Sequence, residues 1–284
     1  MSKLRKNKVA IMGDITTYLI LLLYGAIMSL PLIYAVLQAF KPYNELFIFP
    51  PRFFVKNPTL SNFTQLFDLT SSSWVPFSRY VFNTILNTVV GTIIHILAAA
   101  MCAYPLAKNN FPGKKIIFQV VVWALLFHSA VLEVPAYLVM SYLGIVDTYF
   151  AYWLPEIGAT MGVFLLKQNM DTIPTAMIEA CKIDGASEWT ILWNIIMPCV
   201  KPAWLTLAIF AFQRNWNASS STYIYTETLK TLPSALSQIT AGGSVSRAGE
   251  AYAASIIMMV PAIIFFIIAQ GNTVKTMSHA GIKG

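Results

Sequence analysis

Residues 15–40 read ITTYLILLLYGAIMSLPLIYAVLQAF and contain no charged side chain. A helix that crosses about 30 Å of hydrocarbon needs roughly 20 consecutive, predominantly apolar residues. This stretch is long enough to cross a bilayer with some tilt. Pro31 is compatible with a membrane helix where a neighbouring group satisfies the freed carbonyl. The stretch therefore predicts a transmembrane helix and, with it, an all-α integral membrane protein.

The composition of the whole chain supports this class. Of the 284 residues, 57% are hydrophobic and 11% are charged, whereas soluble domains contain about 45–50% and about 25%. The mean hydropathy is +0.63. A soluble protein of this size could not bury so much apolar surface with so few charges to cover it. Soluble, disordered, collagen-like and coiled-coil classes are thereby excluded.

Five further stretches extend the prediction to six transmembrane helices. The predicted spans cover residues 15–40, 80–107, 116–140, 150–170, 202–217 and 251–270. The fourth and fifth are weaker because they carry charged residues within or at the end of the apolar run. The alternative for the fifth is one helix over residues 189–213. That helix would place Lys201, which lies between Pro198 and Pro202, in the middle of the bilayer, so we favour a break at this point.

The positions of the basic residues predict the orientation. With the arm 1–14 inside, twelve of the 19 Lys and Arg residues lie in that arm, the inner loops and the tail 271–284; six lie outside and one lies within a span. This distribution follows the positive-inside rule. It predicts cytoplasmic termini flanking a transmembrane region over residues 15–270. It also accounts for the net charge of +7 without a nucleic-acid partner.

The cytoplasmic loop over residues 171–201 carries the informative pattern. It reads DTIPTAMIEACKIDGASEWTILWNIIMPCVK. Asp171 or Thr172 is the candidate cap of a first helix that has Pro174 in its first turn. Met177, Ile178 and Cys181 are spaced to share one apolar face of that helix.

A glycine corner separates this helix from a second one. Gly185 ends the first helix, because glycine accepts the left-handed conformation of a sharp helix end. Ser187 is placed to cap the second helix, over residues 188–197, with Glu188 in its first turn. Pro198 ends that helix. Two short helices at a membrane surface form a docking lever rather than a catalytic pocket.

This loop resembles the EAA loop of permease subunits in ABC importers, whose pattern is E-A-A, D-G-A and a hydrophobic-Leu-Pro ending. The matching residues are Glu179, Ala180, Asp184, Gly185, Ala186, Ile196 and Pro198. Cys181 stands where a third alanine is usual, and Met197 stands where leucine is usual. Both replacements are small or flexible apolar side chains that preserve packing.

The resemblance extends over most of the chain and is greatest to the MalG-like branch that imports carbohydrates. It includes AYPLAKNNFPGKK from Ala103, FLLKQ from Phe164, Trp216-Asn217 and the ending NTVKTMSHAGIKG. That ending is similar to a branch associated with oligosaccharides from plant polysaccharides. The resemblance implies a type I ABC importer permease, located in the bacterial cytoplasmic membrane, that forms half of a pathway for an oligosaccharide.

The resemblance also implies the partners. These are a MalF-like second permease, two ABC ATPase subunits, an extracytoplasmic solute-binding protein and the lipid bilayer. ATP and Mg would be bound by the ATPases and no cofactor by this chain. The chain accordingly has no G-x-x-x-x-G-K-[ST] motif. The residues implied in ATPase docking are Met177, Ile178, Glu179, Ala180, Cys181, Asp184, Gly185, Ala186 and Pro198.

Polar residues within the predicted spans are candidates for the substrate path. Asn83, Asn87, Gly91 and His95 recur every four residues and so share a face of the second span. The polar members of this series could hydrogen-bond a sugar or pack helices. Glu133 is either a path residue or a paired structural acid. Arg214 could face the path or extend toward the interface. Trp216 could stack on a sugar or belong to the interfacial aromatic belt, and Asn217 follows it.

Two other functions fit a membrane protein of this size. A membrane-embedded enzyme could use Glu133 and His95 with His128, but the sequence has no G-x-S-x-G motif and no metal-ligand spacing. An autonomous channel or secondary carrier would predict inverted repeats with matched broken helices, and no such repeat stands out. We therefore expect a non-catalytic permease.

Overall fold

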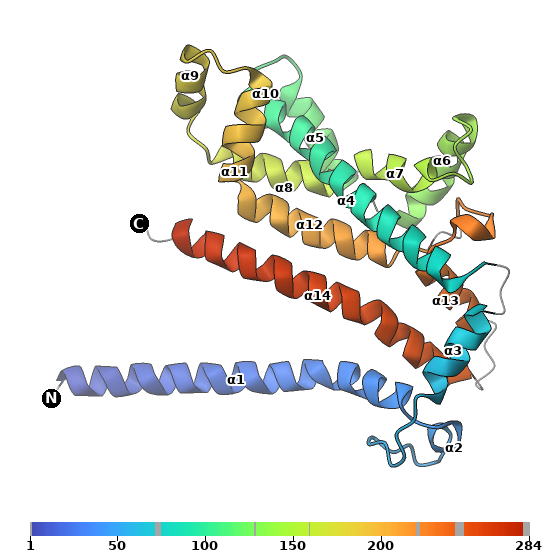
Figure 1. Ribbon diagram of the computed structural model, residues 1–284. Coiled ribbons are helices and arrows are strands. Elements are labelled where there is room, and N and C mark those ends of the chain that lie inside the picture. The colour runs from blue at the N-terminus through green and yellow to red at the C-terminus, as the bar shows by residue number, and fades with distance from the viewer. Residues whose placement is uncertain are drawn as a thin grey trace. The chain divides into compact units, whose positions relative to one another are not determined.

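The computed structural model describes residues 2–71, 75–127, 129–158, 160–219, 222–241 and 247–280. All regular secondary structure in these ranges is helical (Figure 1), which confirms the all-α prediction. The contacts divide the chain into two units. Unit 1 comprises residues 1–69 and 239–257, and unit 2 comprises residues 70–238 and 258–284.

Unit 1 is built on the long helix α1 (Ser2–Ala39). Its apolar part, Thr16–Ala39, has the length and hydropathy of a membrane span. Most of its large apolar side chains are exposed, Leu22 by 72%. Exposed leucines and isoleucines along a whole helix are stable in contact with lipid and not with water.

The end of α1 is held by a side chain from α3 (Ser61–Ser71). Asn62 Nδ2 donates to the carbonyl oxygens of Ala39 and Lys41, at 2.8 Å each. These bonds satisfy carbonyls at a helix end that would otherwise lack partners. Gly249, in the first part of α14 (Ala248–Ala280), packs against the same asparagine, because a Cβ there would lie 2.4 Å from Asn62 Oδ1.

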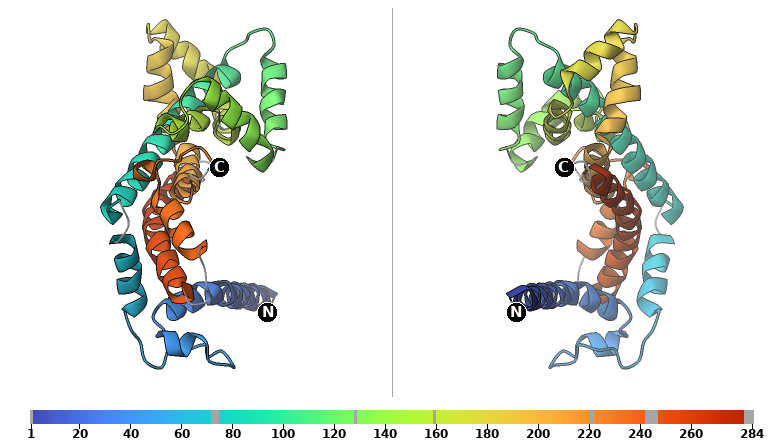
Figure 2. Two further views of the ribbon diagram at one scale, coloured as in Figure 1. Left: turned by 90° about the vertical axis from the view of Figure 1, so that its right-hand side faces the viewer. Right: turned by 90° about the vertical axis from the view of Figure 1, so that its left-hand side faces the viewer.

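Unit 2 is organised around α4 (Phe77–Lys108). Three helices pack along it: α7 (Phe150–Ile157), α8 (Thr160–Asp171) and α12 (Lys201–Trp216). Figure 2 gives two further views of this packing. Gly162 of α8 allows a close approach to α4, because a Cβ there would lie 2.7 Å from Ala99 Cβ and 2.8 Å from His95 Nε2. Small residues at helix contacts are typical of membrane proteins.

The helix break predicted at Lys201 is present. The segment Glu188–Cys199 and helix α12 meet at 84°. Pro198 and Pro202 flank the bend, and proline disfavours a continuous helix because it lacks an N–H group and clashes with the preceding turn. Together these two segments pass the length and hydropathy test for a broken span or a re-entrant loop.

Two predicted spans are not continuous helices. Residues 116–140 divide into α5 (Lys114–Ala124) and α6 (Ser129–Tyr142). The β-branched run over residues 120–122 favours helix only weakly, and the turn that follows it tightens at Leu125. Residues 150–170 divide into α7 and α8 near Gly158, after Pro155. Proline and glycine together disfavour an unbroken helix there.

Three helices are long and apolar enough to cross a membrane among the described residues. They contain Thr16–Ala39, Phe77–Lys108 and Ala248–Ala269. The bent pair brings the total to four if it is counted as one span. Outside the loop over residues 171–201, the remaining described elements are α2 (Tyr43–Leu46), a 3₁₀ turn (Glu227–Leu229) and α13 (Leu232–Ala241).

Candidate coupling loop and interior polar cluster

The predicted glycine corner is present in the loop over residues 171–201. Helix α9 (Thr175–Ile183) ends before Gly185, which has φ = 81°. The amides of Gly185 and Ala186 donate to the carbonyls of Lys182 and Cys181. Glycine adopts this left-handed conformation without the steric penalty of a Cβ. The sequence therefore fixes a sharp turn directly after α9.

The predicted cap of the first helix is wrong. Helix α8 continues through Asp171, and Thr172 Oγ1 donates back to the Asn169 carbonyl. Pro174 occupies the cap position of α9 and contributes no side-chain bond. Proline disfavours a helical conformation in the residue before it, so the helix restarts after Pro174 and not before it.

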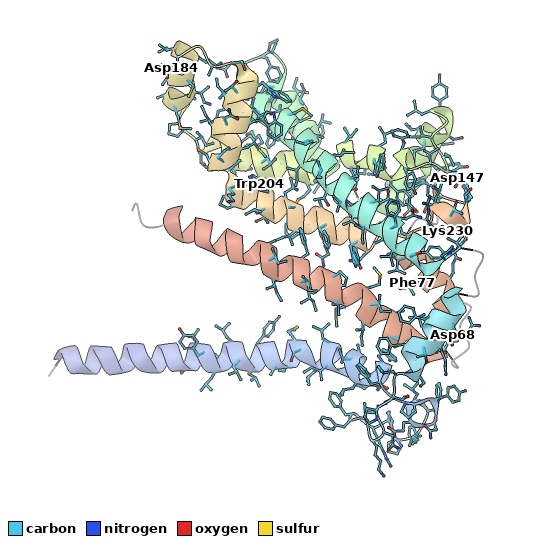
Figure 3. The ribbon with its side chains drawn as sticks, viewed as in Figure 1. Asp68, Phe77, Asp147, Asp184, Trp204 and Lys230 are labelled. Atoms are coloured by element: carbon cyan, nitrogen blue, oxygen red, sulfur yellow. The ribbon has the colours of Figure 1, made fainter. Side chains whose placement is uncertain are left out.

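One face of α9 packs on the protein and the other is open. Ile178 is buried, and Met177 and Cys181 pack against the same hydrophobic cluster. Glu179 and Ala180 are exposed on the other side. Asp184 lies at the tip of this part of unit 2 (Figure 3). A short helix anchored on one side and exposed on the other is suited to contact a second protein.

The second helix begins as predicted and then widens. Ser187 Oγ accepts a hydrogen bond from the Thr190 amide at 3.2 Å and so caps α10 (Glu188–Ile191). The chain continues through a π-helical turn (Leu192–Ile196) into α11 (Met197–Cys199), which contains Pro198. Widened turns of this kind appear mainly as single insertions in α-helices, frequently at functional sites.

Glu188 makes both an ion pair and a hydrogen bond to side chains of other helices. The Lys182 ammonium, 2.6 Å away, and the Tyr104 hydroxyl, 2.5 Å away, both donate to its carboxylate. These two hydrogen bonds, that of Lys182 foremost, hold the pKa of Glu188 below its ordinary value of 4.5. The carboxylate is therefore ionised at neutral pH. The sequence indicated Glu188 only as a first-turn acid and did not reveal its contact with Tyr104.

The polar residues of α4 do share one buried face. Asn83 is fully buried, and its Nδ2 donates to the carbonyls of Thr228 and Lys230 at 2.8 and 2.9 Å. Its Oδ1 accepts a hydrogen bond from the Tyr149 hydroxyl. Asn87 Oδ1 accepts one from Trp153 Nε1 at 3.1 Å. Asn83 therefore joins α4 to the segment that follows α12.

An ion pair lies deeper on the same face. Arg214 Nη2 of α12 donates to the Glu156 carboxylate of α7. His95 Nδ1 of α4 donates to the Glu156 carbonyl at 3.0 Å, which places its proton on Nδ1. Glu156 is 7% exposed. Three helices therefore meet at one buried acid, a residue that the sequence marked only as a charge weakening a span.

Several polar atoms beside this ion pair lack partners within the described part of the chain. They are Asn87 Nδ2, Thr88 Oγ1, Thr92 Oγ1 and Asn215 Nδ2. Buried polar groups are normally hydrogen-bonded, so an unpaired set calls for water or another ligand. Asn215 also contacts the backbone at Gly91, where a Cβ would lie 2.9 Å from its Nδ2.

The other candidate path residues are dispersed. Glu133 lies on the exposed side of α6. Trp216 is buried, and its Nε1 donates to the Met258 carbonyl at 2.9 Å. Asn217 is exposed and donates to the Gln213 carbonyl. His128 lies outside the described residues.

A second anchor of unit 2 lies at Asp147. The amides of Tyr225 and Thr226 donate to Asp147 Oδ1 at 2.9 and 2.8 Å, and the Thr226 hydroxyl donates to Oδ2. These bonds, that of the Thr226 hydroxyl foremost, hold the pKa of Asp147 below its ordinary value of 3.8. Figure 3 shows Asp147 near Lys230, away from Asp184.

Several long apolar helices with exposed apolar side chains define a multi-pass membrane protein. Comparison with known protein families identifies the family within this class. Residues 10–279 match the model for the binding-protein-dependent transport system inner membrane component, and the chain belongs to this family. It is thus a non-catalytic permease of the cytoplasmic membrane.

Individual relatives are similar over almost the whole chain. Protein LplC of Bacillus subtilis is 30% identical over 291 residues, which cover 95% of this chain and 95% of that protein. The arabinooligosaccharides transport system permease protein AraQ of Halalkalibacterium halodurans is 28% identical, with 89% and 91% covered. These relatives confirm the resemblance to carbohydrate ABC importer permeases.

A solved structure supports the fold. One chain of a bacterial ABC transporter involved in the import of the acidic polysaccharide alginate superposes with a TM-score of 0.75. The alignment covers 92% of this chain and 96% of that chain at 20% sequence identity. The architecture of this chain is therefore that of an ABC importer permease.

Proposed function

We propose that this chain forms half of the translocation pathway of an ATP-driven importer for an oligosaccharide. The observation that carries the proposal is the exposed helix α9, ended by Gly185 at φ = 81° and anchored through Ile178, in a chain of this permease family. AraQ, whose name includes arabinooligosaccharides, supports an oligosaccharide as the substrate class.

The partners follow from this proposal. A MalF-like second permease completes the pathway, and two ABC ATPase subunits bind ATP and Mg on the cytoplasmic side. A solute-binding protein delivers the oligosaccharide from outside, as the family description of binding-protein-dependent transport suggests. One ATPase subunit contacts the exposed face of α9 through Glu179, Ala180 and Asp184, and ATP-driven closure then moves the membrane helices.

The topology of the proposal has six spans and cytoplasmic termini. The continuous helices α1, α4 and α14 supply three spans, and helix α12 of the bent pair supplies one. The pairs α5–α6 and α7–α8 supply the other two as broken spans. The excess of Lys and Arg in the resulting inner segments supports this orientation.

The hydrogen bonds within the chain divide the candidate substrate-path residues into bonded residues and residues with polar groups still available. Asn83, His95, Arg214 and Trp216 each bond within the chain, which favours a structural role in the state described. Asn87 retains a buried Nδ2 with no partner among the described residues, so it could meet a sugar hydroxyl only after the helices move apart. Glu133 and Asn217 keep exposed polar groups.

Uptake of labelled arabino-oligosaccharides by cells with and without this chain tests the proposal. We expect accumulation that requires this chain and cellular ATP, and free arabinose should not compete. The matched control is a strain that carries the chain with Tyr142→Phe, an exposed position on α6. Equal uptake of every oligosaccharide tested, with or without the chain, would contradict the proposed function.

A further inference from the structure

Helix α4 holds the coupling loop on both sides of α9. Before α9, Lys108 Nζ donates to the Ile173 carbonyl at 2.5 Å and to the Asp171 carbonyl at 3.4 Å. After the glycine corner, the Tyr104 hydroxyl donates to Glu188 Oε2 at 2.5 Å. Tyr104 and Lys108 lie one helical turn apart, so a single face of α4 contacts both flanks.

Apolar packing surrounds these two polar contacts. Tyr104 is 5% exposed and Ala103 is fully buried, in one cluster with Ile173 and Ile178. Ile191, on the other side of the corner, belongs to the same cluster. A hydrogen bond to a charged group is stronger where water is excluded, and the Tyr104 hydroxyl lies at the edge of such a cluster.

Glu188 joins the two sides of the corner as well. Its Oε1 lies 2.6 Å from Lys182 Nζ of α9, while its Oε2 accepts the bond from Tyr104. The side chains of Lys182 and Glu188 are about half exposed, and exposed ion pairs contribute little on their own. The bond from Tyr104 is therefore the contact that connects this pair to the membrane helix.

We propose that Tyr104 and Lys108 fasten the coupling loop to α4, so that α9 and α4 move as one rigid body when the ATPase closes. This inference rests on the proposed function and assigns both residues as positioning residues. The connection passes from α9 directly to a helix far away in sequence, in addition to the covalent path through α8 and α10.

The outer end of α4 contacts the segment that follows α12, so a motion of α4 would be transmitted to that segment. Tyr80 Oη donates to Glu227 Oε1 at 2.8 Å, and Asn83 holds the carbonyls of Thr228 and Lys230. Helix α4 has 32 residues and is about 48 Å long at 1.5 Å per residue. Movement of its cytoplasmic end would thus reach the external segment that follows α12.

Distance measurements between two spin labels test the inference on the purified transporter complex. The labels are attached at Leu97→Cys on α4 and Ala176→Cys on α9, both at exposed positions, with the three native cysteines replaced by alanine. The distance is measured without nucleotide and with ATP and vanadate. We expect the two values to agree within about 2 Å, the size of a small helix shift.

Variants distinguish the effect of the bonds from Tyr104 and Lys108 from the effect of the ion pair within the loop. In the double variant Tyr104→Phe with Lys108→Met, the distance between the labels should differ by more than about 2 Å between the nucleotide-free state and the state with ATP and vanadate. Uptake per ATP should also fall about tenfold, because the loss of hydrogen bonds to charged groups shifts equilibria by this order. Lys182→Gln, which keeps the bond between Tyr104 and Glu188, should behave as the parent. Tyr142→Phe with Lys115→Met is the matched control at exposed positions.

The outcomes distinguish this inference from the proposed function. An ATP-dependent distance change in the parent would overturn the rigid-body inference and leave the importer function intact. An unchanged distance together with normal uptake in the double variant would also overturn it. Failure of any ATPase to co-purify with the parent would contradict the proposed function itself, and the inference with it.

Discussion

At the scale of single residues, Gly185 and Glu156 differ in how far the sequence reveals them. The position of Gly185 between a helical pattern and a serine cap predicts its left-handed conformation, and the structure has it at φ = 81°. The roles of Glu156 and Glu188 depend on partners more than 50 residues away in sequence, Arg214 and Tyr104 respectively. Sequence spacing carries no signal for such contacts, so neither bond was predicted.

Gly185→Val should leave membrane insertion intact and uncouple ATP hydrolysis from uptake. No atom lies within 4 Å of a Cβ at this position, so the penalty comes from the backbone conformation and amounts to about 1–2 kcal/mol. We expect uptake per ATP hydrolysed in proteoliposomes to fall about tenfold. Gly185→Asn is the matched control, because asparagine adopts this conformation more readily. Normal uptake by the valine variant would contradict a role of this corner in coupling.

Arg214→Met should destabilise the protein by leaving Glu156 buried without its partner. Breaking a buried pair costs about 3–5 kcal/mol. The Arg214 side chain is 46% exposed, so we expect a smaller loss of roughly 2 kcal/mol, or about 5 °C in a detergent thermal-shift assay. The double variant with Glu156→Gln should recover most of the loss. A double variant less stable than Arg214→Met would show that the ion pair is not the cause.

At the scale of elements, local patterns predicted the coupling helices but not the breaks in two spans. The apolar face of α9 and the cap at Ser187 follow from residues within one or two turns of each other. The division of residues 116–140 and 150–170 was missed because hydropathy measures partition into lipid and not helix continuity. Pro155 and Gly158 were visible in the sequence, but proline is also tolerated within membrane helices.

The segment that holds Tyr225 and Thr226 should loosen when Asp147 loses its charge. Its lowered pKa means that the carboxylate contributes stability above about pH 3.8 and loses it as the pH falls further. Asp147→Asn should therefore increase amide hydrogen exchange at Tyr225 and Thr226 about tenfold at neutral pH, because a charged acceptor bonds more strongly. Asp184→Asn, at an exposed position, should not. Equal exchange in both variants would contradict the anchor.

At the scale of the whole molecule, composition and basic-residue distribution predicted the class of protein and its orientation. The family match over residues 10–279 confirms the class, and the alginate transporter chain supports the architecture. Hydropathy predicted all three continuous spans, since each contains at least one long apolar window. The packing of helices around α4 could not be predicted from the sequence, because it depends on contacts between small residues such as Gly162 and side chains distant in sequence.

The orientation makes a direct prediction about reagent access. In intact cells, a cysteine at Phe49, in the predicted outer segment, should react with a membrane-impermeant maleimide. A cysteine at Thr175, at the start of α9, should react only after the cells are opened. Both positions are exposed, so the difference would reflect the side of the membrane and not burial. Rapid labelling at Thr175 in intact cells would contradict cytoplasmic placement of the coupling loop.

A tagged pull-down of this chain from its native membrane in mild detergent tests directly whether it is one subunit of an ATP-driven importer. We expect recovery of one second permease and two ATPase subunits for each copy of the chain, with loss of the ATPases when α9 is altered at Glu179 and Asp184. Recovery of the chain alone, in a stable and monodisperse form, would contradict its assignment as a subunit of an importer complex.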